Sequence, residues 1–268
     1  MGSRTTVGPL LKEWRSHRRM SQLALATTAD VSQRHISFVE SGRSTPSREL
    51  LLHLARALDI PLRDQNLLLT AAGYAKVFTE YDYEAADLAP LRAAVDAMLA
   101  GVEPYPAMAI DRAWNVHRIN EAAGALFGAL LGPDAPVEEP MNLARLVFHP
   151  DGVRRRILNF GAVAAVLLDR IDRDVMLSPD GHDVAALRDE LRTYPGVADI
   201  DRRGGIEAPP AFSLELALDT DSGPMRFFTT LASVGSPTDV TAEELSVEFY
   251  FPLDDRTEAL LRGTESTV

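Results

Sequence analysis

Four hydrogen-bonding side chains gather within five residues of one short stretch, namely Gln33, Arg34, His35 and Ser37. All four can donate hydrogen bonds, and the shapes of Gln and Arg suit the edges of adenine and guanine respectively. In a helix, Ile36 and Val39 would share the inward face and leave these four residues pointing elsewhere. The stretch therefore has the residue types for reading base edges in a DNA groove. A solvated polar helix face is the alternative.

Helix-start and helix-stop residues surround this stretch. Ser21 can cap a first helix that contains Leu23 and Ala26, and Asp30-Val31-Ser32 can break that helix and cap a second one. Gly42 stands where the second helix would end. The pattern predicts two short helices joined by a tight turn.

The stretch resembles the helix-turn-helix of the phage-repressor (XRE) family, from about residue 10 to about residue 73. The family pattern is present as Ser21-Gln22, Leu25-Ala26, Val31-Ser32, Ile36-Ser37, Glu40, Gly42-Arg43 and Pro46-Ser47. One position departs, because Asp30 stands where the family usually has Gly. Asp adopts a left-handed backbone less readily than Gly, so we expect an intact turn with some strain.

This resemblance implies binding to double-stranded operator DNA through the second helix. The implied DNA-binding residues are Gln22, Ser32, Gln33, Arg34, His35, Ser37 and Arg43. Gln22 and Arg43 are assigned to the phosphate backbone, with a generic surface role open for Arg43. The resemblance also pairs Arg15 with Glu40, a structural ion pair. Because a single DNA-binding domain of this size contacts few base pairs, we expect a homodimer on a near-palindromic site.

The charge distribution agrees with DNA binding although the chain is acidic overall. Its net charge is -12, yet residues 1–80 hold 11 Lys and Arg against 7 Asp and Glu, so the acidic excess lies in the rest. A basic head on an acidic body is expected when only one domain docks on DNA. There is no Cys and no apolar run of about 18 residues, so we expect a cytoplasmic protein without disulfides or a membrane span.

A length of 268 residues suggests two domains. We expect an all-α, five-helix, lambda-repressor-like DNA-binding domain over residues 1–78, a connector helix over 79–104, and a second domain over 105–268. In that second domain the pattern predicts a hairpin, with strands at Met108–Ile110 and Trp114–Ile119, and a long helix from Asp151 to about Asp172. Alternating residues predict three more strands, at Phe212–Leu218, Met225–Leu231 and Leu245–Phe251.

The second domain resembles the MmyB-like ligand-binding domain of bacterial regulators. The segments that carry the resemblance are Tyr105–Ala123, Asn142–Arg155 and Met225–Leu261. It implies an α+β PAS-like domain with an antiparallel five-stranded sheet, and a small apolar effector of the fatty-acid type. A domain that only dimerises or binds proteins, with a filled core and no ligand, is the alternative function.

Large aromatic residues expected at the interface of sheet and helices are candidates for lining a pocket: Trp114, Phe127, Phe148, Phe160, Phe212, Phe227 and Phe249. A filled core explains each of them as well. His149, Arg154 and Arg155 stand at the predicted start of the long helix, where they could hold a ligand carboxylate. A solvated basic helix face is the simpler explanation for those three.

The sequence offers no enzyme signature. GxGxxG, GxxxxGK[ST], HExxH and GxSxG are all absent, and the histidines are too scattered to predict a metal site. Asp111 with His117, or Asp151 with His149, could form an acid–base pair, but such residues near turns are usually turn and cap residues. We therefore expect no catalytic residues, no metal and no required cofactor.

Overall fold

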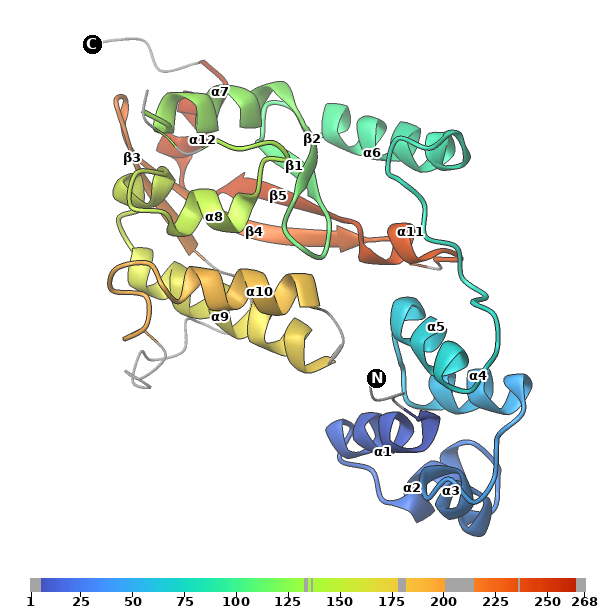
Figure 1. Ribbon diagram of the computed structural model, residues 1–268. Coiled ribbons are helices and arrows are strands. Elements are labelled where there is room, and N and C mark those ends of the chain that lie inside the picture. Colours follow the sequence, from blue (N-terminus) through green and yellow to red (C-terminus); the bar gives the residue numbers. More distant parts are fainter. Residues whose placement is uncertain are drawn as a thin grey trace. The chain divides into compact units, whose positions relative to one another are not determined.

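The computed structural model describes residues 6–132, 135, 137–177, 182–200, 215–235 and 237–263. Contacts divide the chain into two compact units, one made mainly of residues up to Glu80 and the other beginning at Tyr81 (Figure 1). The short segment Pro237–Glu243 groups with the first unit. Each unit has its own core.

The N-terminal unit contains the five expected helices. They are α1 (Val7–His17), α2 (Gln22–Thr28), α3 (Gln33–Glu40), α4 (Arg48–Ala57) and α5 (Leu62–Ala71). Their apolar faces meet in one cluster that includes the fully buried Leu11, Leu25, Val39 and Leu54. Burial of these faces stabilises helices that are too short to be stable alone.

Local signals set the ends of these helices. Ser21, Ser32 and Ser47 each accept a hydrogen bond from the backbone N–H three residues later, at 3.0 to 3.2 Å. Gly42 and Gly73 follow α3 and α5 with φ of +72° and +86°, which favour glycine. The predicted N-cap residues, and the predicted end of the second helix at Gly42, are therefore confirmed.

The C-terminal unit is built on a five-stranded antiparallel sheet, as expected. Its order is β2-β1-β5-β4-β3, and the strands are β1 (Ala107–Ile110), β2 (Val116–Ile119), β3 (Glu215–Thr220), β4 (Gly223–Ser233) and β5 (Ser246–Pro252). The helices after α5 are η1 (Ala86–Leu88), α6 (Ala89–Gly101), α7 (Glu121–Leu130), α8 (Leu143–Phe148), η2 (Val153–Arg156), α9 (Phe160–Leu177), α10 (His182–Leu191), α11 (Val240–Glu244) and α12 (Asp255–Leu261). Of these, the end of α9 from Asp174 and α11 up to Glu243 group with the first unit. Phe212 and the start of its predicted strand lie outside the described residues.

Both faces of this sheet are covered. On one face, Val95 and Leu99 of α6 pack in a buried cluster with Ala109 and Val247 of the sheet. The opposite face carries Glu248 and Tyr250 of β5, which lie against residues of α7, α8 and α9. Glu248 and Tyr250 of the central strand β5 are therefore buried, as is Val247 on the other face.

The prediction of one long helix starting at Asp151 is wrong. The chain instead forms the 3-10 turn η2 and then runs extended at Ile157, which bridges to β3, so that α9 begins only at Phe160. Asn159 holds this break, because its side chain donates to one backbone carbonyl of β3 at 2.8 Å and accepts from a backbone N–H of β3 at 3.0 Å. A tertiary contact with the sheet edge thus replaces helical hydrogen bonds.

Candidate functional site

Helix α3 presents an exposed polar face above a buried apolar one. Gln33, Arg34 and His35 are exposed, whereas Ile36 and Val39 are buried in the core of the head. Ser37 is partly buried, and Ser32 is the N-cap residue. The residues predicted to read bases therefore lie in the first turn of the helix, where a recognition helix contacts base edges.

A buried ion pair fixes α3 to α1. The Arg15 guanidinium donates to both carboxylate oxygens of Glu40, at 2.6 and 2.9 Å, and to the Met20 carbonyl at 2.7 Å. The hydrogen bond to Glu40 raises the pKa of Arg15 above its ordinary value. Gln22 donates to the same carboxylate at 2.8 Å, so its amide is oriented beside α3. These contacts hold the exposed face in one position.

Phe38 was not predicted to contribute to this surface. Its ring lies against two guanidinium groups, with the central carbon of Arg34 5.1 Å and that of Arg43 6.0 Å from the ring centroid. Cation–π contacts of this kind restrict where the two cations point. An aromatic residue four positions after Arg34 on the same helix was the sequence signal for this contact.

The turn before α3 is strained as expected. Asp30 has φ of +47°, in the left-handed region, and the backbone N–H of Val31 donates to the Ala26 carbonyl at 2.9 Å. The departure from Gly at this position therefore leaves the turn intact.

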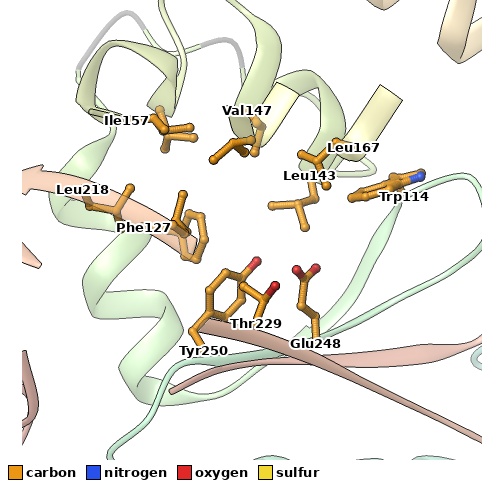
Figure 2. A pocket seen from close by; sticks show the side chains of 13 residues that line it. Trp114, Phe127, Leu143, Val147, Ile157, Leu167, Leu218, Thr229, Glu248 and Tyr250 are labelled. Atoms are coloured by element: carbon orange, nitrogen blue, oxygen red, sulfur yellow. The ribbon is translucent and has the colours of Figure 1, made fainter. Parts of the chain in front are cut away.

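The second candidate site is a cavity of about 30 Å³ between the sheet and its helices (Figure 2). Apolar side chains make most of its wall: Trp114, Phe127, Leu143, Val147, Val153, Ile157, Val163, Leu167, Leu216 and Leu218. Three polar side chains, from Thr229, Glu248 and Tyr250, complete it. Figure 2 shows their oxygen atoms pointing from the strands into the space, toward Leu143 and Val147. An apolar wall with a few convergent polar groups is typical of a ligand pocket.

Glu248 is the unusual member of this wall. It lies on the central strand with 6% of its surface exposed, and its Oε2 has no hydrogen-bond partner in the described part of the chain. Burial raises the pKa of this carboxyl group to about 7, although Arg170 and a hydrogen bond with Tyr250 act in the opposite direction. Burial and the neighbouring carboxylate also raise the pKa of Tyr250.

The predicted hairpin of β1 and β2 is confirmed, but its second strand begins at Val116, so Trp114 reaches the cavity from the turn and not from a strand as predicted. Its φ of +67° is left-handed, and the turn is held by Asp111, which accepts from the Asn115 backbone at 2.9 Å. Asp111 also contacts His117 at 3.1 Å. Burial acts to raise the pKa of Asp111, but its hydrogen bonds with His117 and Asn115 have the larger combined effect. The pKa of Asp111 is therefore below its ordinary value. This pair stabilises the turn that positions Trp114.

A second cavity, of about 110 Å³, adjoins the first. Both are lined by Phe127 and Leu143, and the second extends along the glycines of α7, Gly124 and Gly128. Phe127 and Leu143 are therefore the wall between two apolar spaces. Movement of these two side chains would join the spaces into one.

The other predicted aromatic residues lie elsewhere. Phe148 and Phe227 are fully buried but do not line either cavity. Phe249 packs with the cluster under α6, on the opposite face of the sheet from Glu248. Phe212 lies outside the described residues.

The predicted carboxylate clamp is separate from both cavities. Arg154, Arg155 and Phe160 line an open pocket of about 340 Å³ that shares no residue with them. Arg154 donates to the Pro195 carbonyl at 2.8 Å and lies 4.2 Å from the centroid of Phe160, and burial lowers its pKa. His149 packs edge-on against Tyr194. The long helix α9 begins at Phe160, which lines this pocket, and not at Asp151 as predicted.

Sequence reasoning missed Glu248, Tyr250 and Thr229. The alternation in β5 places Val247 and Phe249 on one face and Glu248 and Tyr250 on the other, without indicating what covers the second face. A helix covers each face of the sheet, so both sets are buried. The one available signal was the order of the elements, since helices both precede and separate the strands.

In the described part of the chain, no helix is long and apolar enough to span a membrane. Within the same ranges, no three side chains of His, Asp or Glu come together in a way that would hold a metal ion.

Comparisons with known proteins find a family match for each of the two units. Residues 91–263 match the MmyB-like transcription regulator ligand binding domain, and residues 11–65 match a helix-turn-helix family. Over 62 residues the chain is 34% identical to Multiprotein-bridging factor 1 of Candida albicans, a match that covers 23% of this chain and 41% of that relative. The chain thus aligns with less than half of that relative's length. The ligand-binding match alone covers more than half of the chain, so this protein belongs to the MmyB-like transcription regulators, with an XRE-type helix-turn-helix before the ligand-binding domain.

Proposed function

We propose that this DNA-binding transcription regulator acts as a homodimer, that α3 enters the major groove of a near-palindromic operator, and that an apolar small molecule in the C-terminal unit controls this binding. The proposal of operator binding rests on one observation. The side chains of Gln33, Arg34 and His35 are exposed on α3, and the Arg15–Glu40 ion pair holds this helix against α1. Rigid presentation of donors is what direct readout of bases requires.

The test of the reading helix is Arg34→Ala, compared with Arg56→Ala on α4. Both side chains are exposed, so both variants remove one positive charge from the head at little cost in stability. We expect Arg34→Ala to weaken operator binding by about 1 to 3 kcal/mol and to relax base preference at one position, whereas Arg56→Ala keeps that preference. Competition binding with single-base operator variants measures this. Unchanged selectivity in Arg34→Ala would refute the assignment of α3.

The ligand part is supported by the two adjoining apolar cavities and by the ligand-binding family match. A drug-sized ligand needs about 300 Å³ or more, so the wall made by Phe127 and Leu143 must move to admit one. The resemblance implies a fatty-acid-like chain. Native mass spectrometry of gently purified protein tests for a retained small molecule, and its absence would favour a C-terminal unit that only dimerises.

Control of DNA binding requires that the ligand prefer one DNA-binding state of the protein. Operator affinity measured with and without the ligand gives the coupling free energy, and ligand affinity measured with and without operator must change by the same factor. If neither affinity changes, ligand binding does not control DNA binding.

A further inference from the structure

We propose that the effector is an apolar molecule with a neutral hydrogen-bond donor, such as a hydroxyl group, which donates to Oε2 of Glu248. This inference rests on the proposed ligand-binding function and specifies the chemistry of the ligand's polar end. It departs from a fatty acid, whose carboxylate would meet a second carboxylate in the cavity.

The incomplete hydrogen bonding of Glu248 is the first step of the argument. A buried carboxylate without all its partners is costly, so an acceptor oxygen left open on a central strand needs an explanation. Tyr250 donates to the carboxylate, but Oε2 lacks a partner within the described ranges. Figure 2 shows that the carboxylate points into the cavity and not into the packed core. The open acceptor is therefore available to a molecule in the cavity.

The surrounding charges select a neutral donor. Above pH 7 Glu248 is mostly ionised, so an anionic ligand would lie beside a second carboxylate, and like charges in a low dielectric repel strongly. A cationic ligand would be near Arg170, which acts electrostatically on Glu248 and whose guanidinium lies 4.7 Å from the ring centroid of Trp114, a wall residue. Arg154 and Arg155, the cations predicted from the sequence to hold a carboxylate, line a different pocket. A neutral O–H group satisfies Oε2 without adding charge.

The shape of the site accommodates an apolar chain behind this donor. From Glu248 the first cavity leads to Phe127 and Leu143, and the second cavity continues beyond them along α7. Gly128 of α7 lines the second cavity and is exposed, and an added Cβ there would meet no atom within 4 Å, so there is open space beside this end of the cavity. A chain with its donor at Glu248 would thus displace the wall and extend toward α7.

Four probes of equal length test the proposal on the full chain: 1-octanol, its isomer 1-methoxyheptane, octanoate and octylamine. Titration calorimetry at pH 8 keeps octanoate anionic and octylamine cationic. We expect 1-octanol to bind about tenfold or more tightly than its isomer, which has the same atoms but no donor, because a hydrogen bond to a charged group contributes this much. Octanoate and octylamine should both bind more weakly than 1-octanol.

Variants then assign the preference to Glu248. Glu248→Leu should bring the octanol-to-ether ratio to about one. The matched control Glu215→Gln, which replaces a partly exposed carboxylate on β3 that contacts Arg226, should keep the wild-type ratio. The ratio measured on wild-type protein remains informative even if Glu248→Leu fails to fold.

The possible outcomes distinguish failure of the neutral-donor inference from failure of the proposed ligand-binding function. Octanoate or octylamine as the tightest probe, or equal binding of the two isomers, would overturn the neutral-donor inference and leave ligand binding intact. Failure of every probe, together with no retained molecule in native mass spectrometry, would overturn the ligand-binding function as well.

Discussion

The buried carboxyl group of Glu248 makes the stability of the C-terminal unit depend on pH in a predictable direction. Burial raises its pKa from the ordinary 4.5 to about 7 in the folded state. Between these values the folded protein binds more protons than the unfolded chain, so the free energy of unfolding falls as pH rises. At about 1.4 kcal/mol per pKa unit, the full loss is about 3 kcal/mol and is complete above pH 7.

Glu248→Gln is the variant that tests this linkage. Gln has nearly the same shape as a protonated Glu but does not titrate, so the variant removes the pH-dependent cost. We expect Glu248→Gln to be more stable than wild type by up to about 3 kcal/mol at pH 8, with the difference shrinking toward pH 5. Urea unfolding at several pH values measures the difference, followed by the fluorescence of Trp114 in the cavity wall with Trp14→Phe introduced into both proteins to remove the second tryptophan signal.

The difference between the two proteins isolates this one group. Other titrating residues, such as Asp111 with its lowered pKa, contribute equally to both proteins and cancel. Glu215→Gln, which changes a partly exposed carboxylate, should show no such trend. A difference between wild type and Glu248→Gln that stays constant from pH 5 to pH 8 would refute the reasoning, as would a variant less stable at pH 8.

Three stability predictions follow from other contacts. Glu40→Ala leaves Arg15 without its partner and should lower the thermal stability of the head by about 3 kcal/mol; a loss under 1 kcal/mol would show that the pair is dispensable. Asp30→Gly relieves the left-handed strain at φ +47° and should raise stability in urea by about 0.5 to 1 kcal/mol, and a decrease would contradict the strain. At Gly152 an added Cβ would lie 2.2 Å from the Leu146 carbonyl oxygen, so Gly152→Ala should cost about 2 kcal/mol in the C-terminal unit; thermal unfolding with no shift would count against this close approach.

The N-terminal unit could be predicted almost completely because its determinants are local. Ser21, Ser32 and Gly42 act on backbone groups within a few residues of themselves, and the helices between them follow from the spacing of apolar residues. The left-handed turn at Asp30 also follows from one position in the chain.

The C-terminal unit shows where such reasoning fails. The sequence predicted α+β architecture and five antiparallel strands, because alternation is visible strand by strand. It also predicted helix from Asp151, since nothing local shows that Ile157 and Asn159 bond to a strand about 60 residues later.

The sequence by itself determined the two-part organisation, the helix that carries Gln33 to Ser37, and the class of each unit. Only the tertiary structure decided which residues line the cavity, because period-two alternation assigns residues to two faces of a sheet without saying what covers each face. Helices cover both faces here, so Glu248 is buried, and its unpartnered oxygen follows from packing that no local pattern records.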